Sequence, residues 1–142
     1  MLPIMINTKI IIDYLHKHLP SLQGIYLFGS YASGYANEKS DVDIAILQEK
    51  CIPSKLKFEL SLDLSLLLKK DVDLVELRYV NTLFQSEIVN TSKRIATFDE
   101  TACDLYENYI LCHAIDFREF RKPLIQDIVK RGYIRDTGNL TE

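Results

Sequence analysis

Apolar and polar positions recur along this chain with two periods, one typical of helices and the other typical of strands. Spacings of three or four residues predict helices at residues 7–18, 53–69 and 80–89, and a long last helix from residue 99 or 101. Short apolar runs predict strands at residues 25–28, 41–47, 71–77 and 94–98. Strands that alternate with helices favour an α/β (α+β) fold, in which helices pack on a small mixed sheet.

The ends and buried sides of these helices follow from particular residues. Asn7 or Thr8 is suited to cap the first helix, and Pro20 stops it. Pro53 suits the start of the second helix, because the first helical N–H has no partner inside the helix. The leucines expected on its buried side are Leu56, Leu60, Leu64, Leu67 and Leu68. Pro123 ends or kinks the last helix. The residues expected on the core side of that helix are Phe98, Ala102, Leu105, Tyr109, Cys112 and Ile115.

Length, composition and charge exclude several classes of protein. The 142 residues suit a single domain over residues 1–142, of which residues 132–142 lack core periodicity and are expected to form a tail. No apolar run approaches the roughly 20 residues that cross a bilayer, and the N-terminus lacks a basic start, so we expect a cytoplasmic protein. The net charge of −3 argues against strong non-specific binding of nucleic acid. Three cysteines without metal-ligand spacing predict free thiols.

The strongest chemical signal is a Gly-Ser turn and an Asp-x-Asp pair that are separated by ten residues. Gly29 and Ser30 follow the strand at residues 25–28; the glycine lets backbone approach a phosphate closely, and the serine hydroxyl adds a donor. Asp41 and Asp43 open the next strand and project from the same face. Two adjacent carboxylates repel each other, and a divalent cation such as Mg²⁺ removes that repulsion while it binds substrate phosphates.

A third acid is expected on the strand at residues 71–77. Asp73 lies inside this strand, where an unpaired carboxylate is costly, and a strand beside Asp41 and Asp43 would bring it into the same cluster. Asp73 could then bind metal, accept the proton of an attacking hydroxyl, or do both. The alternative interpretations are an Asp-x-Asp pair in a solvated loop and an Asp73 that faces water at a strand edge.

At this point the residues resemble a known family. Gly29-Ser30, the pair Asp41-x-Asp43 and a later Asp73 on a Val-Asp-Leu-Val strand are similar to the DNA polymerase β-type nucleotidyltransferase superfamily. The chain looks most like its minimal branch, the MNT-domain antitoxins that are paired with HEPN-domain toxins, and this resemblance extends to residues 116–118. Ser33 departs from the family pattern, because an Arg is common at that position.

The resemblance implies a polymerase β-type fold and a role for each motif residue. Asp41, Asp43 and Asp73 would be catalytic and hold Mg²⁺, whereas Gly29 and Ser30 would hold the triphosphate of ATP. The implied reaction transfers AMP from ATP to a tyrosine of a cognate HEPN ribonuclease toxin and neutralises the toxin. The alternatives are an antitoxin that inhibits by binding alone and a transferase for a small molecule such as an aminoglycoside. RNA tailing is disfavoured by the acidic charge balance.

Overall fold

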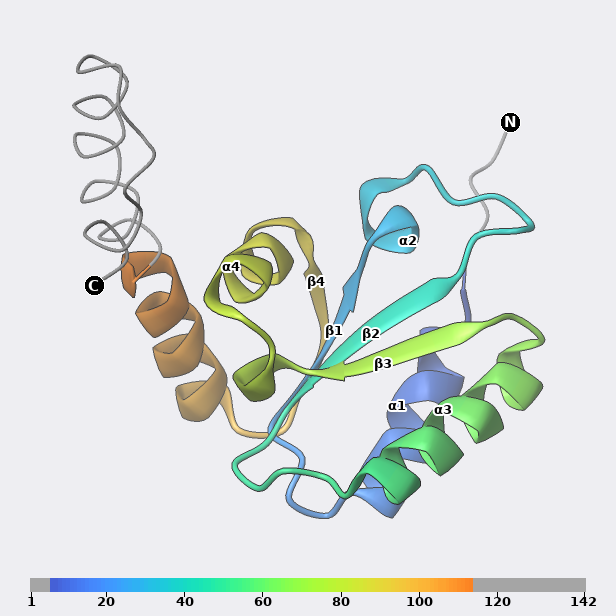
Figure 1. The fold of residues 1–142 in the computed structure, drawn as a ribbon, viewed down its shortest axis with the longest axis horizontal. Helices are drawn as coiled ribbons and strands as arrows, with labels where there is room; N and C mark the ends of the chain where they lie inside the picture. Colours follow the sequence, from blue (N-terminus) through green and yellow to red (C-terminus); the bar gives the residue numbers. More distant parts are fainter. Residues whose placement is uncertain (1–5, 114–142) are drawn as a thin grey trace, which may run out of the picture.

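The computed structural model describes residues 6–113, which form one mixed sheet with helices on both faces (Figure 1). The elements, in chain order, are α1 (Thr8–His18), β1 (Gly24–Phe28), α2 (Ser30–Ser33), β2 (Val42–Leu47), α3 (Ser54–Leu68), β3 (Val72–Glu76), the 3₁₀ turn η1 (Leu77–Tyr79), α4 (Thr82–Thr91) and β4 (Lys93–Thr97). A last helix, orange in Figure 1, occupies residues 100–113. Within residues 6–113, each predicted element is confirmed to within a few residues of its expected bounds.

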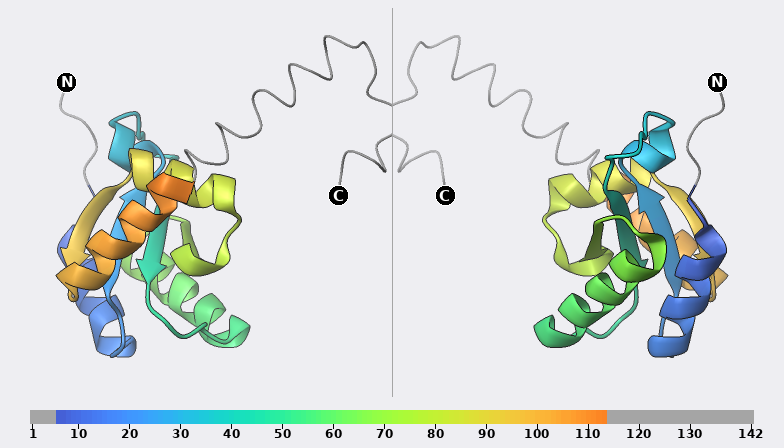
Figure 2. Two further views of the ribbon diagram at one scale, coloured as in Figure 1. Left: turned by 90° about the vertical axis from the view of Figure 1, so that its left-hand side faces the viewer. Right: turned by 90° about the vertical axis from the view of Figure 1, so that its right-hand side faces the viewer.

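The four strands lie in the order β3-β2-β1-β4. β1 pairs antiparallel with both β2 and β4, whereas β2 pairs parallel with β3. A parallel pair needs a crossover connection, and α3 supplies it between β2 and β3. This connection brings the starts of β2 and β3 to the same end of the sheet, which is also where β1 runs into α2 (Figure 2).

Strand alternation divides the core into two layers. On one face, Ile25, Leu27, Ile44 and neighbouring apolar residues pack with the buried residues of α1 and α3. On the other face, Tyr26, Phe28 and Ala45 pack with residues of α4 and of the helix at 100–113. Asp43 and Asp73 share the parity of Ala45 and Val75, so their side chains belong to the second face.

Two predictions about buried helix faces are corrected by the structure. Leu60 and Leu64 are buried as expected, but Leu56 and Leu67 are exposed, because α3 contacts the sheet along a single stripe. The same holds for the last helix, where the expected core residues Leu105, Tyr109 and Cys112 are exposed, as is Phe98 just before it. The buried positions of that helix are Cys103 and Ile110, spaced seven residues apart. The apolar pattern has more than one helical stripe there, and contacts with β1 and α4 select the stripe that is buried.

The cap of α1 and the free state of the cysteines agree with the sequence-based expectations. The Asn7 side chain accepts a hydrogen bond from the Ile10 N–H and caps α1. All three cysteines are free thiols, with Cys51 and Cys112 exposed and Cys103 buried. No helix among residues 6–113 is long and apolar enough to cross a membrane. The expectations for Ile115, for residues 116–118, for the break at Pro123 and for the tail at 132–142 fall outside the described residues.

Candidate active site

The Gly-Ser turn joins β1 to α2 through a backbone conformation that suits glycine. Gly29 has φ 73° and ψ −148°, a backbone conformation that residues other than glycine rarely adopt. Its carbonyl oxygen accepts hydrogen bonds from the N–H groups of Ala32 and Ser33, both at 3.1 Å, and these bonds start α2. Gly34 then ends α2 in the left-handed conformation at φ 85°. The turn therefore presents the start of a short helix at the end of β1.

A second constraint on Gly29 comes from the neighbouring strand. The β1–β2 register pairs Phe28 with Asp43, so the Asp43 side chain lies against the following Gly29. A Cβ atom at position 29 would overlap Oδ2 of Asp43. From the sequence, we expected glycine at this position because a phosphate must approach the backbone. The structure adds a second reason, which is the close approach of the Asp43 carboxylate.

The three acids come from two adjacent strands. The parallel β2–β3 register places Asp43 directly opposite Asp73, on the same face of the sheet. Asp41 lies one residue before β2, and the ladder is extended at this point because the Val42 N–H donates to the Asp71 carbonyl oxygen at 2.8 Å. Asp41 and Asp73 are exposed, whereas Asp43 is half-buried. The structure thus confirms the adjacency of the Asp73 strand that the sequence predicted.

The electrostatics of Asp43 reflect this arrangement. Burial raises the pKa of the Asp43 carboxyl above its usual range, and the negative charges of Asp73 and Asp41 raise it further. Carboxylate oxygens are the ligands that Mg²⁺ prefers, and a cation beside them would offset the repulsion among these carboxylates. The donor chemistry therefore fits a hard divalent cation. Across residues 6–113, no three His, Cys, Asp or Glu side chains are already arranged as a metal site.

The remaining predicted site residues lie in and around α2. Ser30 is half-buried at the first position of α2, where main-chain N–H groups have no partner within the helix. Ser33, which stands where an Arg is common in the family, donates its hydroxyl to the Ser30 carbonyl oxygen at 3.2 Å. The hydroxyl of Ser33 therefore has its hydrogen-bond partner within α2. A phosphate contact of the kind an Arg could make is not offered by this serine.

Two residues near the site escaped the sequence analysis. Phe84 of α4 meets Phe28 edge-on, with ring centroids 5.8 Å apart, so α4 flanks the strand position that pairs with Asp43. Lys70 donates to the carbonyl oxygen of Glu38, in the loop that leads to Asp41, at 3.0 Å. Both contacts join residues far apart in the sequence. In the sequence, the adjacent lysines Lys69 and Lys70 before β3 were the only local sign of the second contact.

Comparisons with known proteins give matches in sequence and in structure. A family model for "Polymerase beta, Nucleotidyltransferase" matches residues 9–101. The protein adenylyltransferase MntA of Shewanella oneidensis is 39% identical over 90 residues, which cover 63% of this chain. That match spans 65% of the length of the curated relative.

Solved structures show the same similarity in three dimensions. A chain in the crystal structure of a toxin-antitoxin with AMP-PNP has a TM-score of 0.76 and 32% identity, over 87% of this chain and 98% of that one. A chain in the structure of a tri-AMPylated Shewanella oneidensis HEPN toxin in complex with MNT antitoxin has a TM-score of 0.69 and 30% identity. The second match covers 85% of this chain and 94% of that one.

Proposed function

Because the chain belongs to the polymerase beta nucleotidyltransferase family, we propose that it transfers AMP from ATP to a tyrosine of a HEPN-domain toxin and thereby neutralises the toxin. The observation that carries this proposal is the pairing of Asp43 with Asp73 beside the Gly29 turn. The names of the similar proteins support both the AMP donor and the toxin partner.

Each site residue has a role in the proposed reaction. Asp41, Asp43 and Asp73 would hold Mg²⁺, which neutralises charge on the triphosphate and on the developing transition state. The N–H groups at the start of α2 and the Ser30 hydroxyl bind phosphate oxygens, and Gly29 keeps the backbone close enough for these bonds. Asp73 is exposed at the strand edge, where it can take the proton of an incoming hydroxyl.

The reaction balances as a single displacement at phosphorus. The phenolic oxygen of the toxin tyrosine forms a bond to the α-phosphorus of ATP, and the bond from that phosphorus to the pyrophosphate oxygen breaks. The phenol proton goes to the Asp73 carboxylate and from there to water. The products are an AMP-tyrosine ester on the toxin and free pyrophosphate.

The exposure of the site suits a protein acceptor. Asp41 and Asp73 are both exposed, so a large partner can bring its own hydroxyl to them. A small substrate would instead need an enclosing pocket to bury most of its surface. In the part of the chain that the structure describes, one open depression is lined by Gln23, Arg78 and Tyr106, and none of the three acids lines it. The free thiols are consistent with a reducing compartment such as the cytoplasm.

Intact mass spectrometry of the toxin tests the proposal. After incubation with this chain, ATP and Mg²⁺, the toxin should gain one or more AMP groups and lose its ribonuclease activity. Chelation of Mg²⁺ with EDTA, or the double substitution Asp41→Asn and Asp43→Asn, should abolish the added mass. If the double variant neutralises the toxin as well as the wild type does, and the wild type adds no mass, inhibition by contact alone is the better account.

A further inference from the structure

The loop at residues 34–41 carries Asp41 into the site, and its shape depends on a small set of hydrogen bonds. The Asn37 carbonyl oxygen accepts from the Ser40 N–H at 3.0 Å, and the Ser40 hydroxyl accepts from the Asn37 N–H at 2.8 Å. The Asn37 side chain also accepts from the Lys39 N–H at 2.7 Å. These bonds make a tight local turn. They do not join the turn to the rest of the protein.

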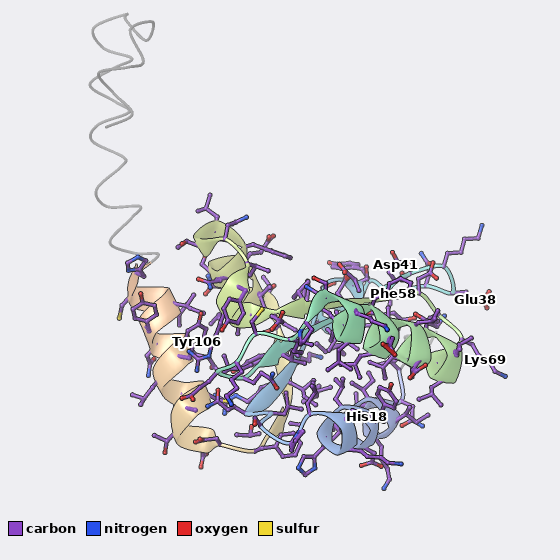
Figure 3. All side chains as sticks on the ribbon, turned by 60° about the horizontal axis from the view of Figure 1, so that its bottom comes forward. His18, Glu38, Asp41, Phe58, Lys69 and Tyr106 are labelled. Carbon is purple, nitrogen blue, oxygen red and sulfur yellow. The ribbon has the colours of Figure 1, made fainter. Side chains whose placement is uncertain are left out.

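Lys70 supplies a connection between this turn and β3. Its ammonium group donates to the Glu38 carbonyl oxygen at 3.0 Å, across 32 positions of sequence. Figure 3 shows Glu38 and Asp41 at the same end of the molecule as Lys69, the residue that precedes Lys70. Asp41 therefore lies between two anchors, the Lys70–Glu38 bond on one side and the Val42–Asp71 backbone bond on the other.

The main chain of Lys70 is itself held in place. Lys69 ends α3 in the left-handed conformation at φ 57°, and this reversal turns the chain toward β3. The Lys70 N–H then donates to the Ser65 carbonyl oxygen at 3.3 Å, while the Ser65 hydroxyl accepts from the Val72 N–H at 3.1 Å. These main-chain contacts at the α3–β3 junction fix the point from which the Lys70 side chain extends. The loop is therefore attached to the strand that carries Asp73.

The acceptor of the Lys70 ammonium group shows whether Lys70 holds the loop in place or neutralises the acids. Three acids, Asp41, Asp43 and Asp73, lie at the starts of β2 and β3, and Lys70 lies two residues before β3. Lys70 nevertheless forms no ion pair within 4.0 Å among the described residues. It donates to a main-chain oxygen instead. An ammonium group on a carboxylate would compete with a metal ion for that ligand, whereas one on a carbonyl leaves the carboxylates available.

We propose that Lys70 is a positioning residue, which tethers the loop through Glu38 and so holds Asp41 at the distance from Asp73 that a shared cation requires. This inference rests on the nucleotidyl transfer proposed for the same site. Small displacements of a catalytic group are costly, because reaction geometry tolerates little error. The tether lowers the conformational freedom of Asp41, whose side chain makes no hydrogen bond to another described residue.

Two readouts on the full chain test the tether without the toxin. Hydrogen–deuterium exchange of the amides in the turn, at Lys39 and Ser40, reports local opening. The Mg²⁺ concentration that gives half of the ATP-dependent rise in melting temperature reports the metal site. Lys70→Met should raise the exchange rate and the required Mg²⁺ concentration by roughly two- to fivefold each, the effect expected for the loss of one exposed charge-assisted bond. Lys70→Arg keeps a charged donor and should restore most of the wild-type behaviour.

Lys69→Met is the matched control, because it removes the same charge one residue away and Lys69 makes no side-chain hydrogen bond or ion pair within residues 6–113. The proposal is overturned if Lys70→Met behaves like Lys69→Met in either readout. A changed Mg²⁺ requirement with unchanged exchange would indicate a charge effect, and faster exchange alone would indicate a merely structural bond. If the wild type gains no stability from Mg²⁺ and ATP, the proposed function fails, and the exchange data still decide the tether.

Discussion

Gly29→Ala should separate catalysis from folding at this site. The substitution adds a single carbon at a residue with φ 73° and ψ −148°, where that carbon would overlap Oδ2 of Asp43. Two effects follow, and they act on different properties. The backbone conformation becomes strained, which lowers stability, and the Asp43 carboxylate must leave its place, which lowers transfer.

The two effects differ in size. A residue other than glycine in this backbone region costs about 1–3 kcal/mol, which corresponds to a fall in Tm of roughly 3–10 °C for a domain of this size. The collision adds less to the free energy of folding, because the overlapping atom is the end of a rotatable side chain. A displacement of about 1 Å at a catalytic group, however, can lower the rate by roughly 100-fold. Transfer should therefore fall far more than stability.

Gly34→Ala is the matched control. Gly34 also has a positive φ, 85°, but a Cβ there would meet no atom within 4 Å. This substitution should cost about 1 kcal/mol and leave AMP transfer nearly unchanged. Urea unfolding measures the stability of each variant, and the rate of AMP incorporation is measured at a temperature where all variants are folded.

Two results would refute this reasoning. Full transfer activity in folded Gly29→Ala would show that the observed position of the Asp43 carboxylate is not needed for the reaction. Equal losses of activity in Gly29→Ala and Gly34→Ala would assign the effect to the loop backbone. A double-mutant cycle with Asp43→Ala measures the collision directly, since its contribution to the free energy of unfolding should disappear in that background.

Three further predictions concern the acids. In metal-free protein the raised pKa of Asp43 contributes stability below the ordinary aspartate range, and this contribution is lost as pH rises through the raised pKa. Asp43→Asn should remove this loss of stability. Urea unfolding in EDTA between about pH 4 and 7 measures it. Asp41→Asn should leave metal-free stability equal or higher, while thermal melting should show little of the wild-type gain from Mg²⁺ and ATP; early unfolding would make Asp41 structural. Glu76, which is 6% exposed, accepts from the Ile52 N–H at 2.8 Å, so Glu76→Ala should cost about 1–3 kcal/mol in urea unfolding and Glu76→Gln less.

The sequence by itself determined much of the local structure and predicted the chemical type of the site. Apolar periodicity located the four strands and the longer helices among the described residues, because the 3.6- and 2-residue periods are properties of short segments. It did not locate α2 or η1, which are too short to show a period. The Gly29-Ser30 turn and the Asp41-x-Asp43 pair were visible as motifs, because their members are close in the sequence. These features were sufficient to predict the fold class and a phosphate-metal chemistry.

The tertiary structure decided the contacts between distant segments. The parallel register that sets Asp43 opposite Asp73, and the β1–β2 register that brings Asp43 against Gly29, arise from strand pairing across many residues. The burial of Cys103, in place of the expected Leu105, depends on which helical stripe meets the sheet. Strand register and helix rotation are selected by packing over the whole core, so local periodicity offers several solutions and only the assembled sheet and helices select one.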